Sequence, residues 1–192
     1  MYRAVDGGPR QALPHGCFDW VGLCEPDEAL MGQVMRQFGL HPLAVEDAMC
    51  AGHPAKVEPY GDQTFVIART AALSGEVIEY GQTAMFLGKD FLVTVRQGNS
   101  RAHLELRSHL EANAERLAEG PDFVLHAVLD FIADGYDPVI DRLDEAVHGL
   151  EEQAIDAFPD PDTIRRIFRL RRQLRRFERI AGPMEEVARR LS

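Results

Sequence analysis

Hydrophobic residues in the first half of the chain form short runs that glycine and proline residues separate, a pattern typical of strands and short helices. The runs that read as strands cover residues 2–5, 18–23, 64–71, 77–87 and 91–96. The segments 74–75 and 88–90 separate the last three of these runs as hairpin turns. We therefore expect an antiparallel meander in this part of the sheet.

Helices are predicted between and after these strands. Asp27 and Glu28 begin a helix that continues to Phe38, because acidic side chains favour the N-terminal end of the helix dipole and Gly39 can close the C-terminal end. A second, shorter helix covers residues 43–49. Residues 104–117 read as an amphipathic helix that ends near Gly120.

From residue 122 onward, apolar residues recur at alternating steps of four and three, the spacing of helices that pack in coiled-coil geometry. The first seam consists of Leu125, Leu129, Ile132, Tyr136, Val139, Leu143, Val147 and Leu150, and the second of Ile167, Leu170, Leu174, Phe177, Ala181, Met184, Ala188 and Leu191. We predict two long antiparallel helices. Pro138 and Pro183 fall inside the seams without changing their phase, so we expect kinks and no breaks.

The two halves of this predicted hairpin carry opposite charges. Residues 121–162 contain twelve acidic residues and, as the only lysine or arginine, Arg142, whereas residues 165–179 contain eight arginines. Five of the acids form one stripe beside the seam: Asp130, Asp134, Asp137, Asp141 and Asp144. These residues could form flanking ion pairs that fix the register, each worth less than about 1 kcal/mol, or part of the stripe could supply oxygen ligands to a hard divalent cation.

Composition narrows the class of protein. With 192 residues, 45% of them hydrophobic and 27% charged, the chain suits one globular domain with an extended appendage. The formal charge of −10 argues against a nucleic-acid partner, since phosphate neutralisation needs a basic face. Cys17, Cys24 and Cys50 form no CxxC pair, so we expect small core residues in a reducing cytosolic environment.

Motifs that carry catalysis are missing from the sequence, which has no GxSxG elbow, no glycine-rich phosphate loop and no HExxH. Cys50 lies near His53, but Pro54 follows and no glycine context for an oxyanion hole surrounds the pair. The sequence also contains no apolar stretch of the roughly 18 to 20 residues that a membrane-spanning helix needs. We therefore expect a soluble chain that is not an enzyme.

The stretch from His41 to Ala68 places two adjacent carboxylates on a short helix before a buried strand. Its residues Leu43, Val45, Lys56, Val57, Glu58, Tyr60 and the core Phe65-Val66-Ile67, in this register, resemble the cytoplasmic domain of the CorA family of divalent-cation transporters. Segments 82–95, 127–145, 167–176 and 183–187 are similar to further parts of that domain. The resemblance therefore covers nearly the whole chain.

This resemblance implies an α/β (α+β) fold. Residues 1–120 would form a mixed, largely antiparallel sheet layered between helices, and residues 121–192 a long helical hairpin that packs on this sheet domain and extends from it. In the family, a stalk helix and two transmembrane helices follow, and five copies assemble around a pore, with this domain on the cytoplasmic side of the inner (plasma) membrane. Because the heptad pattern is unfinished at Ser192, we expect the sequence to be part of such a longer chain.

The resemblance also names candidate metal ligands. In the family, intracellular divalent cations bind between neighbouring cytoplasmic domains and hold the channel closed. Carried over by position, the ligands are Glu46, Asp47 and Asp130. The implied ion is Mg²⁺, as regulatory ligand and as transported ion, with Co²⁺ or Zn²⁺ as alternatives, because the resemblance does not separate the magnesium branch from the zinc branch.

Two simpler interpretations stay open. Glu46 and Asp47 could merely solvate a short exposed helix, and Asp130 could be a plain salt-bridge partner. Beyond these simpler roles for the carboxylates, the whole chain could be a free-standing coiled-coil interaction module whose heptad surface docks another coiled coil. Such a module would associate independently of divalent ions.

Overall fold

The computed structural model describes residues 10, 13–14, 16–75, 77–98, 104–112, 114–156 and 160–191, with the side chains of 104–105, 114–115 and 154–156 left out. The strand predicted at residues 2–5 lies outside this part of the chain. One five-stranded sheet has the order β1-β5-β4-β3-β2. Its strands are β1 (Asp19–Cys24), β2 (Lys56–Tyr60), β3 (Gln63–Ser74), β4 (Val77–Gly88) and β5 (Phe91–Gly98).

The centre of the sheet is the predicted meander, in which β3, β4 and β5 pair antiparallel. β1 pairs with β5 in parallel and β2 with β3 antiparallel, so the sheet is mixed and largely antiparallel, as expected. Strand β2, which contains Pro59, was not predicted from the sequence. A proline cannot donate a ladder hydrogen bond, and it is tolerated here because β2 is an edge strand.

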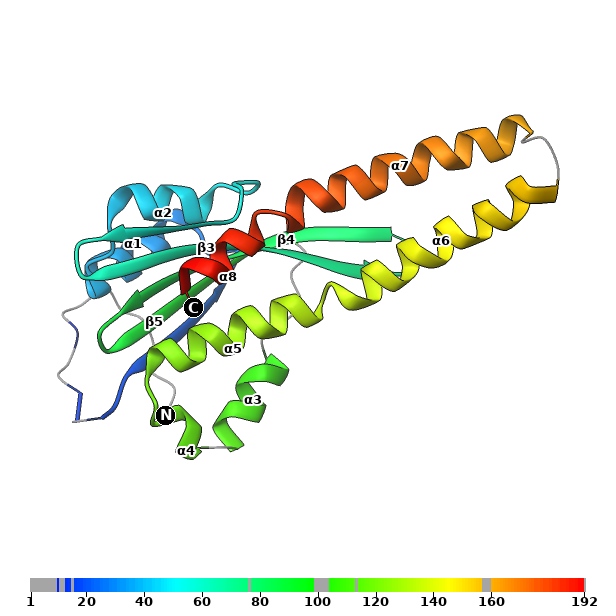
Figure 1. Cartoon of the computed structure of the whole chain (residues 1–192). Coiled ribbons are helices and arrows are strands. Elements are labelled where there is room, and N and C mark those ends of the chain that lie inside the picture. The colour runs from blue at the N-terminus through cyan, green and yellow to red at the C-terminus, as the bar shows by residue number, and fades with distance from the viewer. Residues whose placement is uncertain are drawn as a thin grey trace.

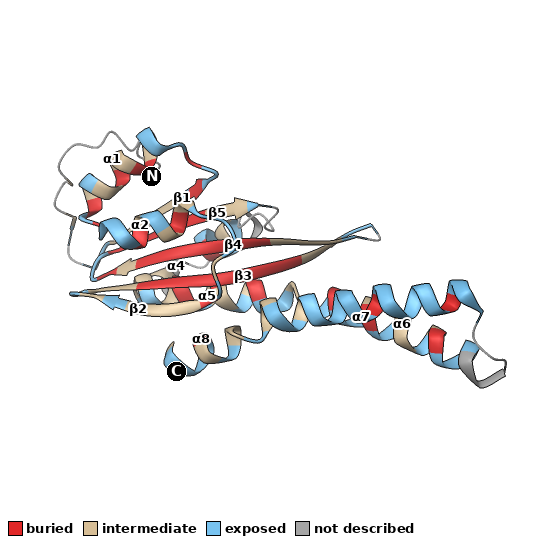
Figure 2. Cartoon of the chain, turned by 90° about the horizontal axis from the view of Figure 1, so that it is seen from above, coloured by how far each residue is buried: buried red, intermediate tan, exposed pale blue. Residues whose placement is uncertain are grey.

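Helices cover both faces of this sheet (Figure 1). On one face lie α1 (Glu28–Phe38) and α2 (Pro42–Met49), and on the other α5 (Pro121–Asp134) and α8 (Met184–Leu191), with α3 (Leu104–Ala112) and α4 (Ala114–Leu117) beside α5. The alternation along β3 serves both cores, since Phe65 and Ile67 pack under α1 and α2 while Val66 and Ala68 pack under α5. The buried middle of β3 and β4 is visible in Figure 2.

Helix α1 has the predicted bounds and a cap at each end. Asp27 is its N-cap and accepts a hydrogen bond from the backbone N–H of Leu30 at 2.7 Å. Gly39 closes the helix in the left-handed conformation, at φ 62°. These local signals explain why the sequence placed this helix correctly.

The C-terminal hairpin is present. Its arms, α6 (Asp137–Asp156) and α7 (Pro161–Ala181), project beyond the sheet side by side (Figures 1 and 2). Seam residues Val139, Leu143, Leu150 and Leu170 form a buried cluster between and beneath them. The second seam is only partly covered, since Ile167 and Leu174, on either side of buried Leu170, are 39% and 38% exposed.

The predicted kinks are wrong in one respect, because each is an interruption of the helix. α5 ends at Asp134 and α6 begins at Asp137, while α7 ends at Ala181 and α8 begins at Met184. Residues at both interruptions contact the backbone of Arg69 in β3. The Arg69 carbonyl accepts a hydrogen bond from the Tyr136 hydroxyl, and the Arg69 N–H donates to Met184 Sδ, with 3.4 Å between nitrogen and sulfur. β2 pairs with β3 only as far as Ile67, so these two turns cover a strand edge that β2 leaves open.

The cysteines also differ from expectation. Cys17, Cys24 and Cys50 are free and exposed, so they do not contribute to the core. Cys24 is the last residue of β1 and Cys50 directly follows α2. Both residues therefore lie where the chain passes into a connecting segment, and such segments run over the protein surface.

Candidate metal site at helix α2

Helix α2 holds the first two predicted ligands. Its N-cap is His41, whose Nδ1 accepts from the Leu43 N–H at 3.3 Å, and whose ring stacks on Tyr60 of β2 at 4.4 Å between centroids. Ala44 and Ala48, one turn apart, are buried against the sheet. The opposite face therefore points outward, with Glu46 exposed and the Asp47 side chain 22% exposed at its rim.

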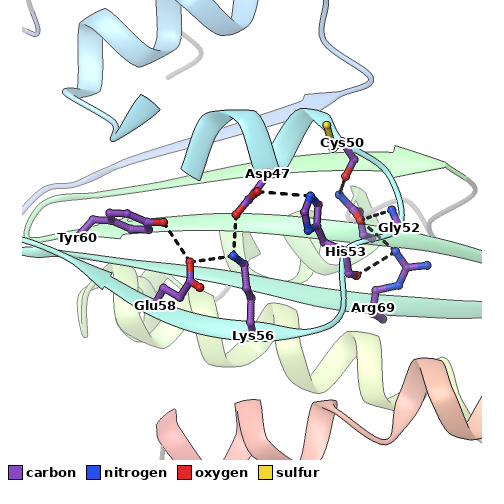
Figure 3. Close-up of polar contacts among 9 residues, drawn as sticks. Asp47, Cys50, Gly52, His53, Lys56, Glu58, Tyr60 and Arg69 are labelled. Atoms are coloured by element: carbon purple, nitrogen blue, oxygen red, sulfur yellow. Dashed lines mark hydrogen bonds and ion pairs between the residues drawn. The ribbon is translucent and has the colours of Figure 1, made fainter. Parts of the chain in front are cut away.

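Asp47 already has partners (Figure 3). Its Oδ2 accepts a hydrogen bond from Lys56 Nζ at 2.6 Å, and its Oδ1 lies 3.4 Å from His53 Nε2. Lys56 Nζ also donates to Glu58 Oε2 at 2.8 Å, and the Tyr60 hydroxyl donates to the same oxygen at 3.1 Å. The result is a chain of alternating charges along β2 that ends on the helix carboxylate.

The charged groups that surround Lys56 stabilise its ammonium form. Burial opposes the ammonium charge of Lys56, but hydrogen bonds to Asp47 and Glu58 outweigh it and hold the pKa of Lys56 above its ordinary value. Burial, followed by the hydrogen bond to Glu58, likewise raises the pKa of Tyr60. The site therefore presents Asp47, paired with Lys56, beside an exposed Glu46.

A buried polar pair fixes the loop behind Asp47. The Gln82 side chain, on β4 and fully buried, donates to the Cys50 carbonyl at 2.9 Å and accepts from the Gly52 N–H at 3.0 Å. Arg69 Nη1 donates to Gln82 Oε1 at 3.0 Å and to the His53 carbonyl at 3.4 Å. Burial lowers the pKa of Arg69, because it disfavours the charged guanidinium. Hydrogen bonds to these acceptors offset part of that desolvation cost.

Neither residue of this pair was predicted from the sequence to be part of the site. A signal existed, because Arg69 and Gln82 are polar residues inside runs predicted as buried strands, and they face each other in the β3–β4 register. Lys56 and His53 were seen, but as a family marker and as an unlikely base. Their contact with Asp47 depends on the fold of residues 50–55, for which the sequence pattern gives no geometry.

Asp130, the third predicted ligand, lies elsewhere. It is exposed on α5, across the sheet from α2. There it lines a cleft of about 640 Å³ between α3, α5 and α8, together with His109, His126, Asp134 and Met184. The structure therefore brings Glu46 and Asp47 together and separates both from Asp130 within one chain.

The predicted ion pairs between the two arms of the hairpin stay a prediction, beside one hydrogen bond between the arms and ion pairs within each arm. Arg166 Nη1 donates to Gln153 Oε1 at 3.1 Å across the hairpin. Asp162 pairs with Arg165 along α7, and His148 Nδ1 lies 3.4 Å from Glu151 Oε2 along α6. An oxygen-ligand role for the rest of the stripe stays a prediction.

Two negative findings apply to the described ranges. In them, no three or more His, Cys, Asp or Glu side chains are arranged to hold a metal ion. Within the same ranges, no helix has the length and apolar character required to cross a membrane.

Comparison with known proteins places the fold. The soluble domain of CorA from Methanocaldococcus jannaschii superposes with a TM-score of 0.72, at 17% identity, over 88% of this chain and 67% of that one. The ZntB cytoplasmic domain from Vibrio parahaemolyticus gives a TM-score of 0.66, at 17% identity, over 90% and 68% of the two chains. At such identities these likenesses establish the α+β fold with its helical hairpin.

Sequence comparison adds the family. The cobalt/magnesium transport protein CorA of Thermotoga maritima is 23% identical over 153 residues, which are 78% of this chain and 43% of that protein. The chain spans less than half the length of the curated relatives it matches first, at 44% and 43%. The profile of the family described as "CorA-like Mg2+ transporter protein" matches residues 16–192, and the chain therefore belongs to that family.

Proposed function

We propose that this chain is the cytoplasmic regulatory domain of a divalent-cation transporter, and that it senses Mg²⁺ between neighbouring copies of itself. The observation that carries the proposal is the separation of the candidate ligands. Glu46 and Asp47 lie on the outward face of α2, on one side of the sheet, and Asp130 lies on α5, on the other side. The carboxylates on α2 can therefore meet an Asp130 side chain only when a second copy of the chain supplies it.

Such a contact joins two different surfaces and is heterologous, the type that closes into rings. This is compatible with the pentamer that the family resemblance implies. Carboxylates from two copies repel each other while the site is empty. A hydrated Mg²⁺ between them removes that repulsion, because this ion accepts one or two carboxylates and keeps several waters. Cation binding and assembly are then linked, and each stabilises the other.

The test combines Mg²⁺ calorimetry with sedimentation velocity. The wild-type chain should bind Mg²⁺ weakly, in about the millimolar range, and should associate more as Mg²⁺ rises. The double substitution Glu46→Ala/Asp47→Ala should abolish both responses. Glu151→Ala/Glu152→Ala removes an adjacent exposed pair from α6 and the same charge, and it should leave them unchanged.

A mixing experiment tests the intersubunit geometry. Asp130→Asn alone should weaken Mg²⁺-dependent association, as the double substitution on α2 should. A mixture of the two variants should regain part of the response, because an intact α2 on one copy can face an intact Asp130 on the next. Identical Mg²⁺ responses in wild type and the α2 double variant would remove the assignment, and absence of recovery in the mixture would remove the intersubunit arrangement.

One observation favours Zn²⁺ as the ion. His53 Nε2 lies 3.4 Å from Asp47 Oδ1, and an imidazole nitrogen beside a carboxylate suits zinc better than magnesium. Zinc sensing predicts that His53→Gln weakens Zn²⁺ binding and leaves Mg²⁺ binding unchanged. The same calorimeter, with ZnCl₂ in place of MgCl₂, distinguishes the two ions.

The interaction module is the other candidate, and the open face of α7 favours it. Ile164, Phe168 and Leu174 are 42%, 60% and 38% exposed on this helix. A module that docks through them would associate equally in MgCl₂ and in EDTA. Phe168→Glu would then abolish the association, whereas the α2 double variant would not.

A further inference from the structure

We infer that Lys56 is a tethered cation that occupies the Asp47 carboxylate in the metal-free chain and competes with the divalent ion for it. The inference rests on the proposed function, since it takes Asp47 as a metal ligand. It adds a residue whose effect on binding is opposite to that of a ligand. Removing Lys56 should tighten cation binding.

The contact geometry supports competition. Lys56 Nζ lies 2.6 Å from Asp47 Oδ2, a short charge-assisted hydrogen bond, and the two side chains are 24% and 22% exposed (Figure 3). A divalent ion bound to the same carboxylate would sit within a few ångströms of the ammonium group. Two cations at that separation repel strongly near a protein surface, so one of them must withdraw.

Lys56 has a place to withdraw to. Its Nζ already donates to Glu58 Oε2 at 2.8 Å, and the Tyr60 hydroxyl holds that same oxygen at 3.1 Å. The backbone of Lys56 is fixed by its pairing with Ile67 in β3. The ammonium group can therefore leave Asp47 by rotation of its own side chain and remain paired with Glu58.

This arrangement assigns distinct tasks to three neighbouring carboxylates. Glu46, exposed and one residue from Asp47, is open to the incoming ion. Asp47 is shared between the ion and Lys56. Glu58 retains the lysine, so the exchange leaves no charge unpaired, and the site responds only when the ion concentration is high enough to outcompete the tethered charge.

The sequence makes the test direct because it contains only two lysines, Lys56 and Lys89. Lys89 lies in the β4–β5 turn, is exposed, and provides a control with the same charge. Lys56→Met should tighten Mg²⁺ binding by about tenfold in calorimetry, from the loss of one unit charge beside the site. Lys56→Arg, which keeps the charge, should stay within about twofold of wild type, and so should Lys89→Met.

A second measurement follows the lysine itself. In protein labelled with ¹³C-lysine, the Cε signal of Lys56 should shift during a MgCl₂ titration with the same midpoint as the calorimetry, while the Lys89 signal stays in place. This measurement uses wild-type protein, so it holds even where a substitution disturbs folding. A Lys56 signal that does not move through saturating Mg²⁺ would overturn the inference.

The outcomes separate the inference from the proposal beneath it. If Asp47→Asn abolishes Mg²⁺ binding but Lys56→Met leaves it unchanged, the tethered-cation role is wrong and the metal site stands. If Asp47→Asn leaves Mg²⁺ binding unchanged, the metal site is wrong and the role of Lys56 falls with it. Equal tightening by Lys56→Met and Lys89→Met would show a general charge effect and would also overturn the inference.

Discussion

Replacing Gln82 by leucine is expected to lower the free energy of unfolding by about 3 kcal/mol. The Gln82 side chain is fully buried and makes three hydrogen bonds, to the Cys50 carbonyl, the Gly52 N–H and the Arg69 guanidinium. Leucine has a similar volume but offers none of these contacts. All three partners then lose an acceptor or donor in a partly or fully buried setting.

The magnitude follows from these contacts. Two neutral hydrogen bonds contribute about 1 kcal/mol each, and the bond from the charged Arg69 about 2 kcal/mol. Burial of the extra apolar surface of leucine returns about 1 kcal/mol. The net loss is a large part of the roughly 5–15 kcal/mol that stabilises an ordinary domain.

Urea denaturation followed by the fluorescence of the single tryptophan, Trp20, measures the loss. Gln97→Leu is the matched control, because Gln97 lies opposite Gln82 in the β4–β5 register and is only partly buried; it should change stability by less than about 0.5 kcal/mol. Hydrogen exchange at the Gly52 amide should accelerate in the Gln82 variant alone. A loss of unfolding free energy below about 1 kcal/mol, or an unchanged exchange rate at the Gly52 amide, would refute the role of Gln82 in holding residues 50–53.

Three further substitutions test other parts of the fold. Gly149→Ala on α6, where a methyl group meets nothing within 4 Å, should raise the unfolding free energy by about 1 kcal/mol, measured by urea denaturation; a decrease would mean that this helix surface is covered. Gly88→Ala should lower it by about 1–3 kcal/mol, because the new methyl group would overlap the ring of buried Phe91, and an unchanged value would show that this ring moves freely. Burial raises the pKa of Tyr136 above its ordinary value of 10, so the neutral hydroxyl that donates to the Arg69 carbonyl contributes stability that is complete below about pH 10 and is lost as pH rises further. Tyr136→Phe should therefore cost about 1 kcal/mol at pH 8 and lose less stability than wild type above pH 10, whereas parallel pH profiles would contradict this.

Local signals predicted most of the sheet and the first helices. The turns at Gly75 and Gly88 and the caps Asp27 and Gly39 act within a few residues, and the structure confirms the elements that they delimit. β2 was not predicted, because its strand conformation depends on a tertiary contact. A five-residue run with an internal proline is a strand only because β3 offers it an edge.

The helix interruptions show the same limit. Heptad phase runs unchanged through residues 135–138 and 182–183, and phase alone cannot separate a kink from a two-residue break. The deciding partner is Arg69, more than sixty residues away from the first turn in sequence. Tyr136 and Met184 both meet its backbone, so the breaks occur where the helices cover the open edge of β3.

The candidate site divides in a similar way. The family pattern named Glu46 and Asp47 and correctly put them on a short helix, since the order of the residues carries that information. It could not show that Asp47 is already paired with Lys56 or that Asp130 lies across the sheet. Those facts depend on how residues 50–55 return the chain to β2 and on which face α5 covers.

Arg69 links the two regions that the proposal needs to communicate. Its side chain holds the loop behind Asp47, through the His53 carbonyl and Gln82, and its backbone meets both helix interruptions. A displacement of the α2 loop therefore acts on the same strand residue that Tyr136 and Met184 contact, where α6 and α7 begin to project from the sheet. A contiguous route of this kind carries coupling only if its elements have two arrangements. Under the proposed function, cation binding at α2 would therefore act on the hairpin through β3, whose side chains pack under the helices on both faces of the sheet.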